Sequence, residues 1–118
     1  MLAAAIALPL AANMPHIVEW DSAEPVELEV SIEPGNIAEV CSKLVRHQAV
    51  AWSFASSQSV DFSIHYHVGR EVVYPMKRFK IARSEGRLEP EIDQTYCWMW
   101  SNRRETATKV SVKLARRP

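Results

Sequence analysis

The chain has 118 residues, which is enough for one domain with a single hydrophobic core and too few for two. Fourteen acidic side chains balance fourteen basic ones, so no overall field favours nucleic acid or an anionic membrane. The three glycines of the chain form no glycine-rich phosphate loop. We therefore expect one globular domain without a nucleic-acid partner.

The first twelve residues have the composition of a signal peptide. They read MLAAAIALPLAA, with no charge and many Ala and Leu residues, and they are shorter than the ~20 apolar residues of a transmembrane helix. No basic residue precedes them, so an apolar N-terminus without targeting function is the alternative. We expect a signal peptide over 1–12, an N-terminal segment over 13–23 and a single domain over 24–118. The mature protein would be periplasmic or secreted, without a transmembrane anchor.

Alternating apolar and polar residues predict strands in the first half of this domain. Residues 24–32 follow a clean two-residue period and end at turn-forming residues. A second strand is predicted over 37–45. Residues 49–55 and 60–67 show the same alternation on either side of a polar stretch, 56–59. These two strands are predicted to form a β-hairpin with a four-residue loop.

The second half contains both the weakest and the strongest strand patterns. Residues 71–74 predict a short strand that Pro75 stops, because proline cannot donate a ladder hydrogen bond. Residues 76–82 form at most a weak strand, with loop from there to residue 90. Residues 94–101 are apolar on both faces, as in a central strand, and 106–114 predict a last strand. The sequence therefore predicts an all-β, antiparallel β-sandwich of about seven to eight strands.

Cys41 and Cys97 lie in two different predicted strands. An exported chain with two cysteines most simply joins them. The bridge would close the loop 41–97, which contributes about 4 kcal/mol in the loop-entropy model. Two separate buried thiols are the alternative.

Four segments together resemble a GOLD (Golgi dynamics) domain, the β-sandwich of the lumenal part of eukaryotic cargo receptors. They are EVC at 39–41, VAWSF at 50–54, VDFSI at 60–64 and YCWMWSN at 96–102. The resemblance covers roughly residues 37–114. It implies a non-catalytic domain for protein or lipid contacts, with the two cysteines joined as in many members.

The chain departs from that family in two strings, IHYH at 64–67 and the Trp-Met-Trp run at 98–100. We do not expect either in the cargo receptors. The chain is more similar to short bacterial exported proteins that share IHYH and YCWMW. That similarity implies export but no particular activity.

The IHYH string places two histidines on one face of a strand. His65 and His67 would lie about 6.5–7 Å apart along the chain, close enough to share a metal ion. Asp61 shares that face if the strand is regular, and His47 is a candidate from elsewhere in the chain. Copper or zinc would suit these ligands. The alternative is a polar, solvated face that binds nothing.

Aromatic residues offer a second candidate site. Tyr96, Trp98 and Trp100 share one face of a predicted strand, where they either fill the core or form a platform for a sugar, a cation or a partner loop. Trp100 is near the end of the strand, so we expect it to be the most exposed of the three. Trp100 and Tyr74 are the predicted ligand-binding residues.

The sequence contains no recognisable catalytic motif. No serine lies in a nucleophile elbow, and carboxylate pairs cannot be picked out by spacing. We therefore expect no enzyme, but an exported binding or interaction module with a protein, lipid or small-molecule partner. A periplasmic copper or zinc protein that uses His65 and His67 is the alternative. A structural protein without a small ligand is the third reading.

Overall fold

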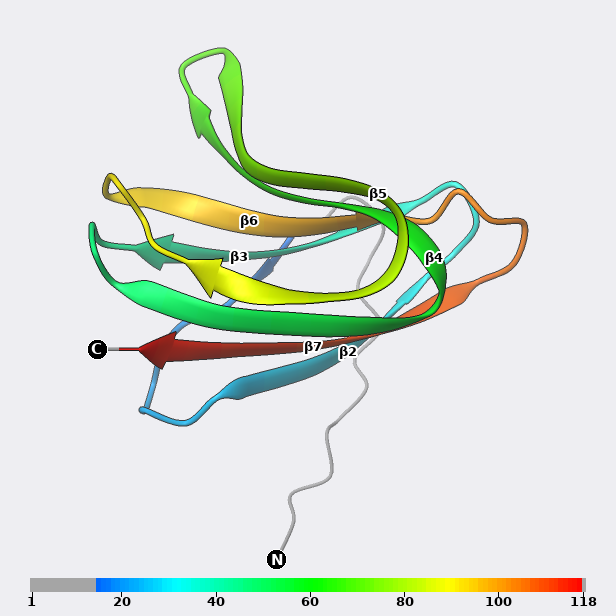
Figure 1. Cartoon of the computed structure of the whole chain (residues 1–118), viewed down its shortest axis with the longest axis horizontal. Helices are drawn as coiled ribbons and strands as arrows, with labels where there is room; N and C mark the ends of the chain where they lie inside the picture. Colours follow the sequence, from blue (N-terminus) through cyan, green and yellow to red (C-terminus); the bar gives the residue numbers. More distant parts are fainter. Residues whose placement is uncertain (1–14, 118) are drawn as a thin grey trace, which may run out of the picture.

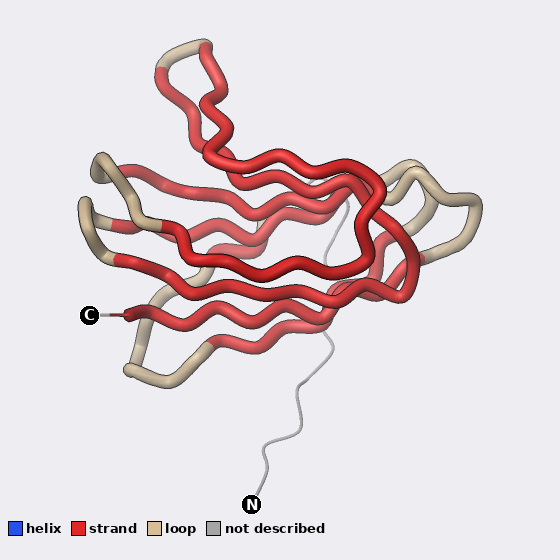
Figure 2. The backbone as a smooth tube through the Cα atoms, viewed as in Figure 1, coloured by secondary structure: helices blue, strands red, loops and turns tan. Residues whose placement is uncertain are grey.

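The computed structural model describes residues 15–117, which form strands and loops (Figure 2). The predicted signal peptide lies outside these residues. Within them, no helix is long and apolar enough to cross a membrane. The seven strands in chain order are β1 (His16–Ile17), β2 (Val26–Ile32), β3 (Ile37–Leu44), β4 (Ala49–Val68), β5 (Glu71–Leu88), β6 (Gln94–Ser101) and β7 (Thr108–Arg117).

The strands form one connected sheet in the order β1-β3-β6-β4-β7-β2, with β5 beside β4 (Figure 1). Neighbours are antiparallel except for β1 and β3. Residues 49–56 of β4 pair with β7, whereas residues 61–65 pair with β6. The sheet therefore curls into a half-barrel with two arms. We call β2, β7 and residues 49–56 of β4 the β7 arm, and β1, β3, β6 and residues 61–65 of β4 the β6 arm.

The all-β prediction is confirmed, but the predicted sandwich of two sheets is not. The strands predicted over 24–32, 37–45, 94–101 and 106–114 are present as β2, β3, β6 and β7, each within a few residues of the expected bounds. In an aligned sandwich, two separate sheets pack face to face. Here β4 belongs to both arms and joins them into a single sheet.

The predicted hairpin over residues 49–67 is wrong, because residues 56–59 bend β4 without reversing it. The pairing register of β4 shifts between Ala55 and Val60, as at a β-bulge. The polar side chains there hold the start of β7. Lys109 N donates to Ser57 Oγ over 2.9 Å, and Gln58 Nε2 donates to the Ala107 carbonyl over 2.9 Å. Residues 56–59 therefore form a bend in β4 that connects the two arms.

The prediction that Pro75 ends a strand, with loop from 83 to 90, is also wrong. β5 continues through Pro75 to Leu88, and the chain reverses before it at Gly69, whose φ of +60° suits glycine. Within residues 15–117, β5 pairs with β4 alone, so it is an edge strand. Proline is tolerated at an edge, where a missing N–H removes no ladder bond. The register also shifts near Pro75, between Ile64 and Tyr66 of β4.

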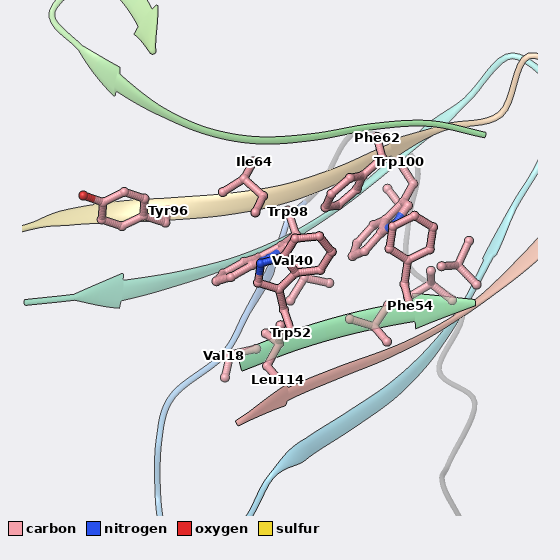
Figure 3. Packing of buried hydrophobic residues seen from close by; sticks show 14 of the residues in the cluster. Val18, Val40, Trp52, Phe54, Phe62, Ile64, Tyr96, Trp98, Trp100 and Leu114 are labelled. Carbon is pink, nitrogen blue, oxygen red and sulfur yellow. The ribbon is translucent and has the colours of Figure 1, made fainter. Parts of the chain in front are cut away.

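The core lies between the two arms and combines aromatic rings with Val, Ile and Leu side chains (Figure 3). Phe54 of the β7 arm contacts Phe62 of the β6 arm, with ring centroids 4.7 Å apart, and Trp52 contacts the same Phe62 at 5.2 Å. Trp98 and Trp100 of β6 are fully buried. The expectation that Trp100 is exposed is therefore wrong, and Trp100 cannot contact a ligand from solvent.

Asn102, directly after β6, connects the two arms at one end of the core. Its side chain is buried and donates to the carbonyls of Ile32 and Thr106, each over 2.9 Å. Its Oδ1 accepts from Arg104 N over 2.8 Å. Its backbone N–H donates to the Asn36 carbonyl over 3.0 Å. Its own carbonyl accepts from Gly35 N over 2.9 Å, so this residue pairs with five backbone groups around the ends of β2 and β6.

Candidate functional site

The predicted disulfide between Cys41 and Cys97 is present. The two cysteines are register partners on the adjacent strands β3 and β6, with Cα atoms 4.0 Å apart. Their neighbours Val40 and Trp98 point into the core. Because successive side chains of a strand alternate in direction, the bridge lies on the outer face of the β6 arm.

His65 of β4 lies beside this bridge, since it is the register partner of Cys97. Its Nε2 is 3.3 Å from Oε2 of Glu39 on β3. The His65 side chain is 6% exposed and the Glu39 side chain 20% exposed. Hydrogen bonding with His65 is the main cause that holds the pKa of Glu39 below its ordinary value of 4.5, and it outweighs burial, which acts to raise it.

The structure brings together only some of the predicted metal ligands. The rings of His65 and His67 have centroids 5.4 Å apart, and His67 is exposed. Asp61 is four residues from His65, about 13 Å along a strand. It instead accepts from Arg103 Nε over 2.6 Å and from Lys80 N over 3.1 Å. His47 lies in the turn between β3 and β4.

Across residues 15–117, one group of three His, Cys, Asp or Glu side chains has converging ligand atoms. It consists of Glu39, His65 and Cys97, whose ligand atoms all lie within 4.8 Å of one another. With Cys97 held in the disulfide, only His65 and Glu39 remain as donors in this group. Metal binding by His65 and His67 therefore stays a prediction.

A second candidate site lies on β5, where two aromatic side chains face solvent. Tyr74 is 42% exposed and Phe79 65% exposed, and Lys77 Nζ lies 4.1 Å from the Tyr74 ring centroid. With Met99 and Arg103, these residues line a hollow of about 110 Å³. We call Tyr74, Lys77, Phe79, Met99 and Arg103 the β5 surface.

Sequence reasoning found Tyr74 but missed Phe79, which it placed in a weak strand of unknown partners. A usable signal was the local charge. Residues 70–88 contain six of the fourteen basic residues of the chain and only two of its acidic ones. All eight charged side chains are exposed. In a chain without net charge, an exposed Phe within a basic segment indicates a surface for contact with another molecule.

A further hollow, of about 550 Å³, lies over the β7 arm and the end of β5 and is less distinctive. Small side chains such as Ser53, Ala55 and Ser111 form its floor, and its rims carry both acidic and basic groups, among them Glu27 and Arg83. The large exposed apolar side chains lie elsewhere. We therefore regard it as a solvated sheet face.

No family model and no curated protein sequence matches the chain. Its fold is similar to that of PliG from Aeromonas hydrophila, a periplasmic inhibitor of g-type lysozyme. The TM-score is 0.65 at 12% sequence identity, over 87% of this chain and 96% of PliG.

Two further solved structures have this fold. The Yersinia pseudotuberculosis-derived mitogen matches with a TM-score of 0.61 at 8% identity, over 80% of this chain and 86% of the mitogen. CorA of Methylomicrobium album BG8, a surface-associated copper-binding protein, matches with a TM-score of 0.56 at 8% identity, over 90% of this chain and 99% of CorA. At these identities the likeness concerns the fold alone.

Proposed function

We propose that this protein is an exported, non-catalytic binding module whose β5 surface docks an acidic partner protein. The observation that carries the proposal is the 65% exposure of Phe79 on a basic edge strand. Exposed aromatic side chains beside basic ones are typical anchors of protein interfaces. The basic excess of β5 selects a partner of opposite charge.

The shape of β5 favours docking through side chains over the addition of a partner strand. Strand addition needs a regular row of free N–H and C=O groups. Pro75 lacks an N–H, and the register of β5 shifts near Pro75 and again between residues 78 and 81. These irregularities are the devices that protect an edge from unspecific pairing. A partner can instead place a side chain in the hollow between Tyr74, Phe79 and Met99.

Export is supported by two independent features. The Cys41–Cys97 disulfide is typical of oxidising compartments, and residues 1–12 have signal-peptide composition. The fold is shared with a periplasmic inhibitor and with a surface-associated protein. The GOLD resemblance, which implies protein or lipid contacts, agrees with an interaction role.

Acidic proteins are the partners that the charge of β5 favours, and the fold shared with PliG adds g-type lysozyme as a second partner to examine. Purified mature protein is immobilised and tested by surface plasmon resonance against g-type lysozyme and against acidic proteins captured from the extracytoplasmic fraction of the host. We expect a saturable complex that Phe79→Ser weakens at least about tenfold, as for an interface hot spot. Lysozyme turnover with and without the protein then shows whether docking also inhibits.

Control variants and salt dependence distinguish binding through the β5 surface from nonspecific hydrophobic adsorption. Val45→Ser and Ile92→Ser remove other exposed apolar side chains, 57% and 41% exposed, and should leave binding unchanged. Lys77→Glu should slow association, and added salt should weaken wild-type binding, because exposed charges are screened beyond about 8 Å at physiological ionic strength. A partner that binds Phe79→Ser as tightly as wild type would refute the proposed surface.

A further inference from the structure

The disulfide has two metal-binding side chains as immediate neighbours. Cys97 pairs in register with Cys41 on one side and with His65 on the other. Glu39 is two residues before Cys41, so it shares the outer face of β3 with that cysteine. The ligand atoms of Glu39, His65 and Cys97 already lie within 4.8 Å of one another. Three adjacent strands therefore converge on one small volume beside the bridge.

His65 directs its Nε2 toward Glu39, and its other ring nitrogen, Nδ1, is unused within residues 15–117. The residue is 4% exposed, and its Nδ1 is fully buried without a hydrogen-bond partner among the described residues. A buried polar atom without a partner destabilises the folded state, so such atoms in native proteins call for an explanation. Glu39 is the most exposed member of the group, which leaves an approach from solvent on its side.

We propose that reduction of the Cys41–Cys97 bridge turns this corner into a zinc site. Its four ligands are the thiolates of Cys41 and Cys97, one ring nitrogen of His65 and one carboxylate oxygen of Glu39. A dithiol reductant supplies two electrons and two protons, the S–S bond breaks, and the reductant is oxidised to its own disulfide. Zn²⁺ then binds both sulfurs as thiolates and displaces their two protons to solvent.

The donor set selects zinc over the hard cations. Two thiolates, an imidazole and a carboxylate are ligands that zinc accepts in tetrahedral geometry, with bonds of about 2.0–2.3 Å. Such bonds require ligand atoms roughly 3.3–3.8 Å apart. Glu39, His65 and Cys97 lie within 4.8 Å of one another and need only small side-chain movements. The Cys41 sulfur, which is bonded to Cys97 in the bridge, has to move away from Cys97 once the bridge is broken. Calcium and magnesium prefer oxygen ligands alone.

The oxidised and the zinc-bound forms exclude each other, because a sulfur in the bridge cannot act as a thiolate ligand. His65 and Glu39 alone supply two donors, too few for a structural zinc site. Zinc binding by this four-ligand site is thus expected only in the reduced chain. This inference does not rest on the β5 surface, since none of the four ligands belongs to it.

The test uses Co²⁺ as a visible probe for Zn²⁺. The full chain is reduced with a phosphine, which does not compete strongly for metal, and is titrated anaerobically with Co²⁺. We expect one equivalent to give tetrahedral d–d bands and thiolate-to-cobalt charge-transfer absorption, both lost when Zn²⁺ is added. The oxidised protein should give neither signal. A reduced wild-type protein without these bands overturns the proposal.

Single variants identify the ligands. His65→Ala and Glu39→Gln should each weaken Co²⁺ binding by about tenfold or more, a loss common even for groups that only support a ligand. His67→Ala is the matched control, because His67 is on the same strand face but outside the converging group. Equal affinity of His65→Ala and wild type would show a simple dithiol complex and refute the site.

If reduction unfolds the chain, refolding by Zn²⁺ tests the same site. Far-UV circular dichroism of the reduced protein is then recorded with and without Zn²⁺. Recovery of the strand spectrum, or a rise of the melting temperature by zinc in wild type but not in His65→Ala, supports the site. A reduced chain that zinc neither refolds nor stabilises overturns it.

Discussion

The two arms of the sheet share one core but differ in what they present to solvent. The outer face of the β7 arm carries small side chains, such as Ala51, Ser53 and Ala55, between charged rims. The outer face of the β6 arm carries the disulfide, and His65 lies against it. Both faces include residues of the same strand, β4. Alternation along β4 therefore decides which side chains are buried. The strands beside each half of β4 decide which chemical groups its outward side chains contact.

The inner faces, in contrast, act as a single unit. Phe54 from one arm and Phe62 and Trp100 from the other pack with ring centroids 4.7 to 5.7 Å apart. Aromatic contacts of this kind add to the hydrophobic burial of each ring. We therefore expect the two arms to unfold together, although only one of them carries the candidate metal ligands.

The largest expected effect comes from the shared core. Trp98→Ala removes a fully buried side chain of β6 and should lower the free energy of unfolding by about 3–5 kcal/mol. Urea unfolding followed by circular dichroism measures the loss. Hydrogen exchange should show both arms losing protection. Protection that persists in the β7 arm alone would contradict a common core.

Removal of the disulfide should act mainly through the unfolded chain. Cys41→Ser/Cys97→Ser opens a bridge between residues 56 apart in sequence and should lower the free energy of unfolding by about 2–4 kcal/mol. Urea unfolding of this variant, compared with Ser111→Ala on the outer face of the β7 arm, gives the difference. A loss equal to that of the control would mean that the bridge does not stabilise the β6 arm.

Asn102 tests the connection between the arms. Asn102→Ala leaves the carbonyls of Ile32 and Thr106 without their donor and should lower the free energy of unfolding by about 1–3 kcal/mol. Asn36→Ala is the control, because the Asn36 side chain makes none of these bonds. Thermal unfolding compares the two variants, and equal melting temperatures would remove Asn102 from this role.

The smallest effect, and the sharpest distinction between the outer faces, is expected from pH. The pKa of Glu39 is lowered in the folded protein, so its stabilising contribution is complete above pH 4.5. This contribution is lost as the pH falls through the folded pKa. Wild type and Glu39→Gln should therefore differ above pH 4.5 and converge as the pH falls toward 3. Urea unfolding at several pH values measures this difference, which should be absent for Glu27→Gln on the β7 arm.

The sequence predicted the elements whose local pattern agreed with their environment. Residues 94–101 are apolar on both faces, and β6 is indeed a central strand between β3 and β4. The disulfide was predicted from two cysteines and an expected signal peptide. Phe79 was missed because edge strands carry polar and irregular sequences, which resemble loops. Trp100 was placed wrongly because exposure near a strand end depends on what packs against the side chain, here Phe54 and Phe62 of β4.

By itself the sequence determined the all-β class, the inward face of most strands and the pairing of Cys41 with Cys97. These properties depend on a two-residue period and on cysteine count, which are local or compositional. Only the tertiary structure decided that residues 56–59 bend rather than turn, and that β5 is a long edge strand. It also placed His65 against the disulfide instead of with Asp61. Such facts depend on the register between strands far apart in sequence. A shift of this register by one residue gives every side chain different neighbours.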